Sequence, residues 1–225
     1  LAVAEVGSVP AAMGNTADRA AVSLFDGDSW QSPSLLDSAV QAHVPAPWSP
    51  WLPVHVARDG LLYFGLGASE PNSPSIIARF DPGSGAIQTL PAHPGICAVG
   101  DPPHEGVWLG GGGLFRLEGD RITRIVRPEW IFHTKVRTIA NAHEGGTWIG
   151  TSEDGVVYAP TTGPWQRYTT EEGLADNDVV DILETQDGLW AATQTGISRF
   201  DGRRWQPHAL PPSLVCESTF LKWGD

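Results

Sequence analysis

One segment of this chain recurs in approximate copies along most of its length, and its pattern constrains the fold more than any other feature. The clearest copy spans residues 179–208, VVDILETQDGLWAATQTGISRFDGRRWQPH. Gln-Asp-Gly, Thr-Gly and Asp-Gly turns separate its four short, mostly apolar stretches. Glycine reaches positive φ without steric cost, and Asp hydrogen-bonds the turning backbone. The segment therefore predicts four strands joined by tight turns in one antiparallel meander.

Three landmarks of this unit keep their order in the other copies. The second-strand Trp falls at Trp108, Trp148 and Trp190, 40 and 42 residues apart, and residues 62–65 are a weaker match. The third strand with its turn recurs at residues 24–27, 79–83, 116–119 and 199–202, and a fourth-strand Trp-Gln pair begins at Trp30, Trp165 and Trp205. A period of about 40 residues is typical of one propeller blade. We therefore predict an all-β protein, a β-propeller of four-stranded antiparallel blades.

The two chain ends supply complementary parts of one blade. Residues 1–6, 20–25 and 29–31 are expected to be second, third and fourth strands with a loop at 7–19, and residues 214–221 are typical of an innermost strand. Joining the ends closes a ring, which removes exposed sheet edges. The prediction is a single domain, 1–225, of five blades: 214–225 plus 1–50, 51–94, 95–130, 131–177 and 178–213. The alternative is a fragment of a larger ring.

Aromatic content fits repeated blades, and helix is scarce. The ten Trp residues exceed the usual share of a domain of this length. Those that repeat in register are expected to wedge between blades as core residues. A helix is expected only at residues 34–44, in the loop between the first and second blades, with Pro33 and Pro45 at its borders.

Charge and hydropathy exclude some partners. The formal net charge of -12 argues against nucleic acid, whose binding needs clustered Lys and Arg. No apolar run reaches the roughly 18 residues of a membrane span, so no membrane-spanning segment is predicted. The sequence begins at Leu1 without a signal peptide or initiating Met, which indicates a removed leader or a longer chain that was cut.

No cofactor and no metal site is predicted. Cys97 and Cys216 fall on expected innermost strands of blades that are not neighbours. They are therefore expected to be small buried hydrophobes rather than a disulfide. Two lone thiols without a CxxC spacing do not make a zinc site.

Several motifs of the repeat resemble those of a known family. They are GTWIGT at 146–151, WQRYT at 165–169, EGLADN at 172–177 and the segment 187–205. Together they resemble the two-component regulator propeller repeat, with good matches in the last two blades and a partial match in the third. The resemblance implies a β-propeller of the kind found in the extracytoplasmic sensing part of hybrid histidine kinases. The segment IARFDPGSG at 77–85 is also similar to repeats of streptogramin lyases, which are propeller enzymes.

The candidate binding residues are aromatics outside the repeat register. Loops between second and third strands and linkers between blades are expected on one face, where a rigid scaffold carries variable loops. Amphipathic rings on such loops anchor a protein partner or a small ligand, although a linker Trp can also simply plug the channel mouth. The candidates are Trp48, Trp51, Trp130 and Phe132 with the adjacent His133, and, on innermost strands facing the channel, His55 and Arg137.

Two classes of function remain open. The first is a non-catalytic β-propeller that binds, either as a subunit docking onto a larger protein assembly or as an extracytoplasmic sensor-type ligand-binding domain. The second is a propeller enzyme of streptogramin lyase type acting at the channel mouth. The pairs His104-Glu105 and His143-Glu144 could supply an acid and a base. Both pairs occupy the position of the turn between a first and a second strand, so they are interpreted as turn residues. This favours the non-catalytic binding module, and no catalytic residue is predicted.

Overall fold

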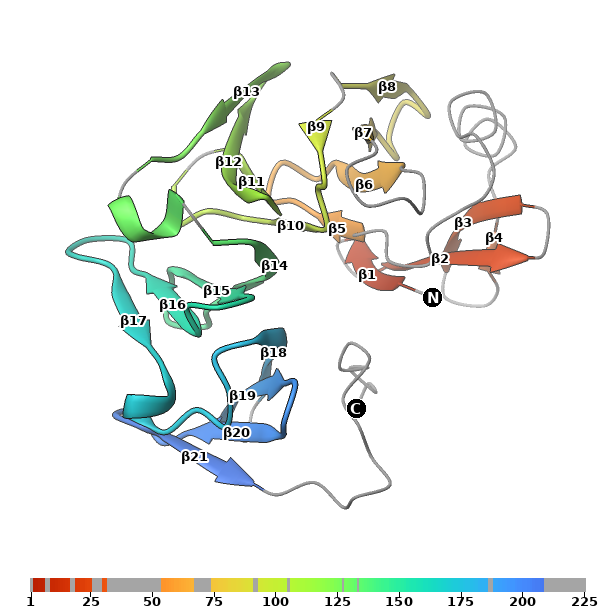
Figure 1. Cartoon of the computed structure of the whole chain (residues 1–225). Coiled ribbons are helices and arrows are strands. Elements are labelled where there is room, and N and C mark those ends of the chain that lie inside the picture. Colours follow the sequence, from red (N-terminus) through yellow and green to blue (C-terminus); the bar gives the residue numbers. More distant parts are fainter. Residues whose placement is uncertain are drawn as a thin grey trace. The chain divides into compact units, whose positions relative to one another are not determined.

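Short antiparallel strands follow one another in consecutive meanders in the computed structural model (Figure 1). The structure describes residues 2–6, 9–16, 19–25, 30–31, 54–66, 74–90, 93–104, 106–126, 128–132, 134–185 and 188–208. These residues fall into two compact units, Leu1–Gly100 with Gly119–Ile122, and Asp101–Glu118 with Thr123–Asp225.

The first sheet contains β1 (Ala2–Val6), β2 (Val9–Thr16), β3 (Arg19–Phe25) and β4 (Trp30–Gln31), in that order. The predicted loop at 7–19 is therefore wrong, because most of it is strand β2. Pro10 pairs only with Glu5 of β1, and the β2–β3 register begins one residue later, at Ala11 opposite Leu24. A proline at the end of a ladder removes no hydrogen bond from the strand on its other side, so a central strand tolerates it here.

This correction changes the prediction for the chain ends. Residues 2–6 form the first strand of their sheet, not the second, and the sheet reaches four strands within residues 2–31. It needs no innermost strand from residues 214–221, which lie outside the described residues together with Cys216. The predicted helix at 34–44 lies outside them as well.

The second and third sheets repeat the meander. β5 (Val54–Val56), β6 (Leu62–Leu66), β7 (Pro74–Phe80) and β8 (Ile87–Thr89) form the second sheet, and β9 (His93–Pro94) adds a short pairing to β7. β10 (Ala98–Gly100), β11 (Val107–Gly111), β12 (Gly113–Glu118) and β13 (Arg121–Arg124) form the third. Apart from β9, the strands of each sheet pair with their neighbours in sequence order, as the repeat predicted.

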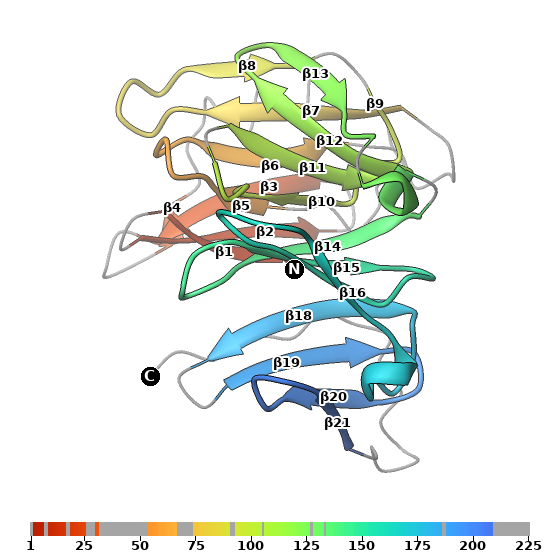
Figure 2. The ribbon, with the colours of Figure 1, turned by 90° about the vertical axis from the view of Figure 1, so that its left-hand side faces the viewer.

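The fourth and fifth sheets lie side by side in both views (Figures 1 and 2). The fourth is β14 (Val136–Asn141), β15 (Thr147–Thr151), β16 (Val156–Ala159) and β17 (Gln166–Tyr168). The fifth is β18 (Val179–Thr185), β19 (Gly188–Thr193), β20 (Ile197–Phe200) and β21 (Trp205–His208). The four strands predicted from the clearest repeat copy are confirmed, in the predicted order.

Helical structure among the described residues is limited to two single-turn 3-10 helices, η1 (Glu129–Phe132) and η2 (Thr170–Glu172). Both lie in linkers between sheets. The described part of the chain therefore contains no helix of membrane-spanning length.

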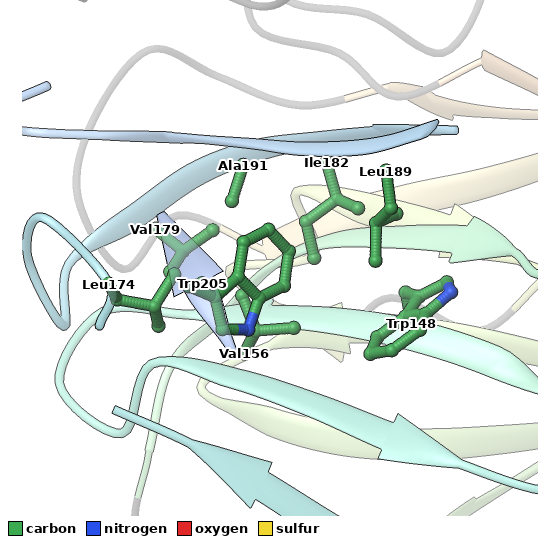
Figure 3. Close-up of a cluster of buried hydrophobic side chains, with 8 residues drawn as sticks. All are labelled: Trp148, Val156, Leu174, Val179, Ile182, Leu189, Ala191 and Trp205. Atoms are coloured by element: carbon green, nitrogen blue, oxygen red, sulfur yellow. The ribbon is translucent and has the colours of Figure 1, made fainter. Parts of the chain in front are cut away.

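The in-register aromatics form the core between neighbouring sheets, as predicted. Trp148 of β15 and Trp205 of β21 are 7% and 2% exposed, and their ring centroids lie 6.4 Å apart. Figure 3 shows both rings among the buried side chains of β16, β18 and β19. One sheet earlier, Trp108 and Trp165 meet in the same way at 5.3 Å. Trp108 and Trp148, each on the second strand of its sheet, therefore pack against a Trp of the next sheet, Trp165 and Trp205 respectively.

The EGLADN linker is held in one conformation. The Glu172 carboxylate accepts a hydrogen bond from the Thr169 backbone N at 2.7 Å, which forms a capping box around η2. Gly173 has a φ of 98°, and a Cβ there would overlap the Trp205 carbonyl oxygen. The motif that carries the family resemblance is therefore a structural joint between two sheets.

Candidate functional site

The turns and linkers at one end of the last two sheets form a surface that we call the linker face. It comprises the turns at 152–155 and 194–196, the described residues of 128–135, and residues 169–178. Figure 2 shows η1 and η2 on the same, right-hand side of these sheets. In the turns, Thr151 Oγ1 donates to the Gly155 carbonyl at 2.8 Å and Thr193 Oγ1 to the Gly196 carbonyl at 2.7 Å.

Backbone hydrogen bonds tie the linkers to these turns. Ser152 N donates to the Lys135 carbonyl at 2.9 Å, and Gln194 N donates to the Asp178 carbonyl at 3.0 Å. Because the two bonds occupy equivalent places in consecutive sheets, the repeat itself fixes the backbone of the linker face. Side chains on this face are therefore carried by a rigid support.

An aromatic and cationic patch lies on the linker face around η1. Trp130 is half-buried, and the Arg167 guanidinium carbon lies 5.6 Å from its ring centroid. Arg167 Nη1 also donates to Asp154 Oδ1 at 3.0 Å, which holds the guanidinium in place. Val126, four residues before Trp130, is 52% exposed. We call Val126, Trp130, Asp154 and Arg167 the Trp130 patch.

Arg137 occupies a different place, at a bulge in the innermost strand β14. The β14–β15 register shifts between Val136 and Thr138, and such a shift re-aims the side chain between them. Arg137 Nη2 thereby reaches Asp178 Oδ2 at 3.1 Å, just before β18. The structure thus brings together a predicted candidate and a carboxylate of the next sheet.

The Arg137–Asp178 pair is incompletely satisfied among the described residues. Arg137 Nε and Asp178 Oδ1 are buried and have no hydrogen-bond partner there. Burial is the largest influence on the Asp178 carboxyl and raises its pKa, although the charge of Arg137 opposes it. A single bond at 3.1 Å therefore does not offset the desolvation of this carboxylate.

Other acidic side chains join neighbouring sheets. Thr138 Oγ1 donates to Asp181 Oδ1 at 2.9 Å, and His143 N donates to Glu184 Oε2 at 2.8 Å. His143 lies in the turn between β14 and β15, so its interpretation as a turn residue is confirmed. These carboxylates serve as inter-sheet hydrogen-bond acceptors.

The remaining predicted candidates are not gathered into one site. His55 lies in β5 and is half-buried, Phe132 ends η1, and Cys97 is half-buried just before β10. Trp48, Trp51 and His133 lie outside the described residues. The Trp130 patch and the Arg137–Asp178 pair share no residue. In the described part of the chain, no three His, Cys, Asp or Glu side chains are placed to hold one metal ion.

Sequence reasoning missed three residues of these arrangements. Asp178 is not a candidate in the sequence, because its pairing with Arg137 depends on the bulge of β14, which no residue pattern predicts. Arg167 and Asp154 meet at Trp130 from strand β17 and a turn, and this meeting depends on the three-dimensional fold. The one available signal was Trp130 itself, an aromatic outside the repeat register.

Solved structures with the same fold share little sequence with this chain. The extracellular domain of BT4673, a candidate one-component system of B. thetaiotaomicron, matches with a TM-score of 0.57 at 17% identity, over 87% of this chain and 26% of that one. A candidate oxidoreductase (glucose dehydrogenase) from Thermus thermophilus matches at 0.56 and 12% identity, over 95% and 83%. YCF48 bound to a D1 peptide matches at 0.50 and 13% identity, over 92% and 65%.

This chain spans about a quarter of the BT4673 domain and less than two thirds of YCF48. The sequence matches no model of a known protein family and no curated protein. At these identities the likeness concerns the fold alone. The described sheets and these neighbours show that the chain has an all-β propeller fold of four-stranded antiparallel blades.

Proposed function

We propose that this protein is a non-catalytic β-propeller module that binds a protein partner through the Trp130 patch. The observation that carries the proposal is the preformed pair of Trp130 and Arg167, whose guanidinium carbon lies 5.6 Å from the ring centroid; Val126, four residues earlier in the chain, is 52% exposed. Trp and Arg are the residue types most enriched among those that dominate binding energy at protein interfaces. Asp154 holds Arg167 in advance, so little side-chain entropy is lost on binding.

The acidic groups of the innermost strands support binding rather than chemistry. A general acid or base needs a carboxyl that is free to exchange a proton with substrate. Asp178, Asp181 and Glu184 instead accept hydrogen bonds from the neighbouring sheet, at 3.1, 2.9 and 2.8 Å. Each of these carboxylates therefore serves a contact between sheets.

We further propose an extracytoplasmic location, with a role in a sensor or a larger surface assembly. The likeness to the extracellular domain of BT4673 supports the location, and the motifs at 146–151 and 172–177 support a sensor role. The likeness to YCF48, whose structure holds a bound peptide, supports recognition of a protein segment. The net charge of -12 agrees with a partner other than nucleic acid.

Native mass spectrometry of the tagged chain, isolated gently from its source, tests the proposal. The wild-type chain is expected to carry one partner protein in stoichiometric amount. Trp130→Ala and Arg167→Ala should each reduce the bound fraction at least tenfold, because each removes half of the stacked pair. A bare monomer, or a monomer carrying only a small molecule, would overturn the proposal.

Arg203→Ala is the matched control. Arg203 is exposed in the turn between β20 and β21 and carries the same charge as Arg167 outside the Trp130 patch. Its removal should leave the complex intact. Equal losses for Arg203→Ala and Arg167→Ala would indicate that charge alone, not the patch, holds the partner.

A further inference from the structure

The linker face carries a negative charge that the opposite turns of the same sheets lack. Its segments 152–155 and 169–178 contain no Lys or Arg and six carboxylates, those of Glu153, Asp154, Glu171, Glu172, Asp176 and Asp178. The opposite turns at 142–146 and 201–204 contain two carboxylates and two Arg, so their formal charges cancel. The two ends of these sheets therefore differ in the charge of the partner that they attract.

The acidic segments lie close enough together for their charges to interact. They are in contact, because Gly155 N donates to the Asn177 carbonyl at 3.0 Å. Burial is the largest influence on the carboxyl of Asp178 and raises its pKa, and the charges of Asp176 and Glu153 raise it further. Positive charge from outside the chain would relieve this repulsion between carboxylates.

The chain's own cations neutralise only part of this charge. Asp154 pairs with Arg167 of the Trp130 patch, and Asp178 pairs with Arg137. The other four carboxylates form no ion pair within the described part of the chain. Because Asp154 balances the charge of Arg167, the Trp130 patch does not by itself repel a cationic partner.

The arrangement of the carboxylates fits a polypeptide better than a single metal ion. Among the described residues, no three acidic, His or Cys side chains are placed to hold one ion. Lys and Arg carry their charge at the end of long side chains, so several of them on one segment can reach separate carboxylates. Trp130 adds apolar surface at the edge of the same charges, because the Arg167 guanidinium contacts both its ring and Asp154.

We propose that the linker face binds a basic protein segment, which places an apolar residue on the Trp130 patch and Lys or Arg side chains against Glu153 and Asp176. This inference rests on the proposed function, because it names the partner of the same surface. Opposite charges across an interface accelerate association and fix its register, and like charges exclude wrong partners. An acidic segment is therefore rejected here.

Fluorescence anisotropy with two labelled peptides of equal length tests the sign of the partner. Both peptides have a central Leu-Phe pair, flanked by Lys in one and by Glu in the other. The wild-type chain is expected to bind the Lys-rich peptide at least about tenfold more tightly than the Glu-rich peptide. Raising the NaCl concentration from about 20 mM to about 200 mM should weaken this binding about tenfold, because salt screens exposed charges.

Glu153→Gln/Asp176→Asn locates the charge effect on the linker face. The Asn side chain keeps an oxygen for the Asp178 N, which donates to Asp176 Oδ1 at 3.0 Å, so the linker should stay folded. The variant should bind the Lys-rich peptide about fivefold more weakly, with a smaller salt dependence. The matched control is Glu118→Gln/Glu144→Gln, which removes two exposed charges at the end of β12 and in the turn before β15. Its binding should equal that of the wild type.

Three outcomes would overturn the inference. The first is equal or tighter binding of the Glu-rich peptide. The second is an equal loss in both double variants, which would mean that net charge rather than the linker face attracts the peptide. The third is binding of neither peptide. The proposed function is tested separately by the effect of Trp130→Ala on the native complex, so it would survive if that complex needs Trp130 but contains an acidic partner segment.

Discussion

Single glycines at the joints of the repeat decide whether one sheet can follow another. Gly173 combines a positive φ of 98° with close approach to the Trp205 carbonyl, whereas Gly202 has a similar φ of 93° and open space around it. Both positions require a positive φ, but only Gly173 also lacks the space for a Cβ atom. A side chain at Gly173 faces both penalties, and one at Gly202 faces only the first.

Gly173→Ala is predicted to lower the free energy of unfolding by about 3 kcal/mol, because backbone strain and a backbone clash combine. Gly202→Ala should cost about 1 to 2 kcal/mol, the strain of a left-handed residue alone. Urea denaturation of both variants measures the difference. Equal losses would mean that the joint at Gly173 relaxes freely.

Asp178 gives a pH-dependent prediction at the same scale. Burial raises its pKa, so the folded state holds the proton more tightly than the unfolded state. The stabilisation of the folded state by protonated Asp178 is therefore fully present below the ordinary pKa of 3.8. It is lost as the pH rises through the folded-state pKa. Asp178→Asn should be at least as stable as wild type at pH 7, with the advantage vanishing in acid.

Asp201 provides the control of opposite sign. Hydrogen bonds from the backbone N of Arg204 and Arg203 lower its pKa. Asp201→Asn should therefore lose stability at pH 7, and the loss should vanish as the pH falls through the lowered pKa. Thermal melts from pH 3 to 8 compare the two variants. A clear loss for Asp178→Asn at pH 7 would show that the Arg137 pair outweighs desolvation.

The strands differ in how far their sequence alone determined them. Those of the fifth sheet were predicted because Asp-Gly and Thr-Gly corners bracket short apolar runs, and the local preference agrees with the final pairing. Strand β2 was missed because Pro10 and Gly14 are typical of loops, and only the register shows that Pro10 lies beyond the β3 ladder. In β2, hydrogen-bonded pairing with β1 and β3 therefore outweighs the low strand propensity of these residues.

The candidate site follows the same division. Trp130 was predicted because it breaks the repeat register, which is visible in the sequence. Its partners Arg167 and Asp154 come from a strand and a turn whose meeting depends on how the sheets twist. The pairing of Asp178 likewise depends on the bulge of β14, which shifts the register around Arg137. The repeats can be recognised from their local sequence pattern, but the contacts between repeats cannot.

The packing of one sheet on the next can be measured through its aromatic pair. Trp148→Ala and Trp205→Ala are each predicted to lower the free energy of unfolding by about 3 to 5 kcal/mol, because both rings are almost fully buried. Their centroids lie 6.4 Å apart, so the double variant should lose less than the sum of the two. Denaturant unfolding of the four proteins gives the coupling. Strict additivity would mean that the sheets do not share one core there.

At the scale of the whole molecule, the residues that join the sheets of the second unit differ for the most part from those of the proposed binding surface. In-register aromatics and inter-sheet hydrogen bonds join the sheets, and the linker face carries the residues that this joining leaves exposed. A scaffold of this kind tolerates change on its linkers while its repeat stays fixed. Val126 is 52% exposed, whereas Trp130 is half-buried and packs against the core cluster that contains Trp108 and Ile149, with the Arg167 guanidinium over its ring.

Hydrogen exchange of the chain, alone and with its co-isolated partner, tests the central claim of a binding face most directly. The predicted result is added protection in peptides covering 128–132, 152–155 and 165–168, with none in the opposite turns at 142–146 and 201–204. Protection confined to those opposite turns, or to the innermost strands around Arg137, would contradict the assignment of the binding surface to the Trp130 patch.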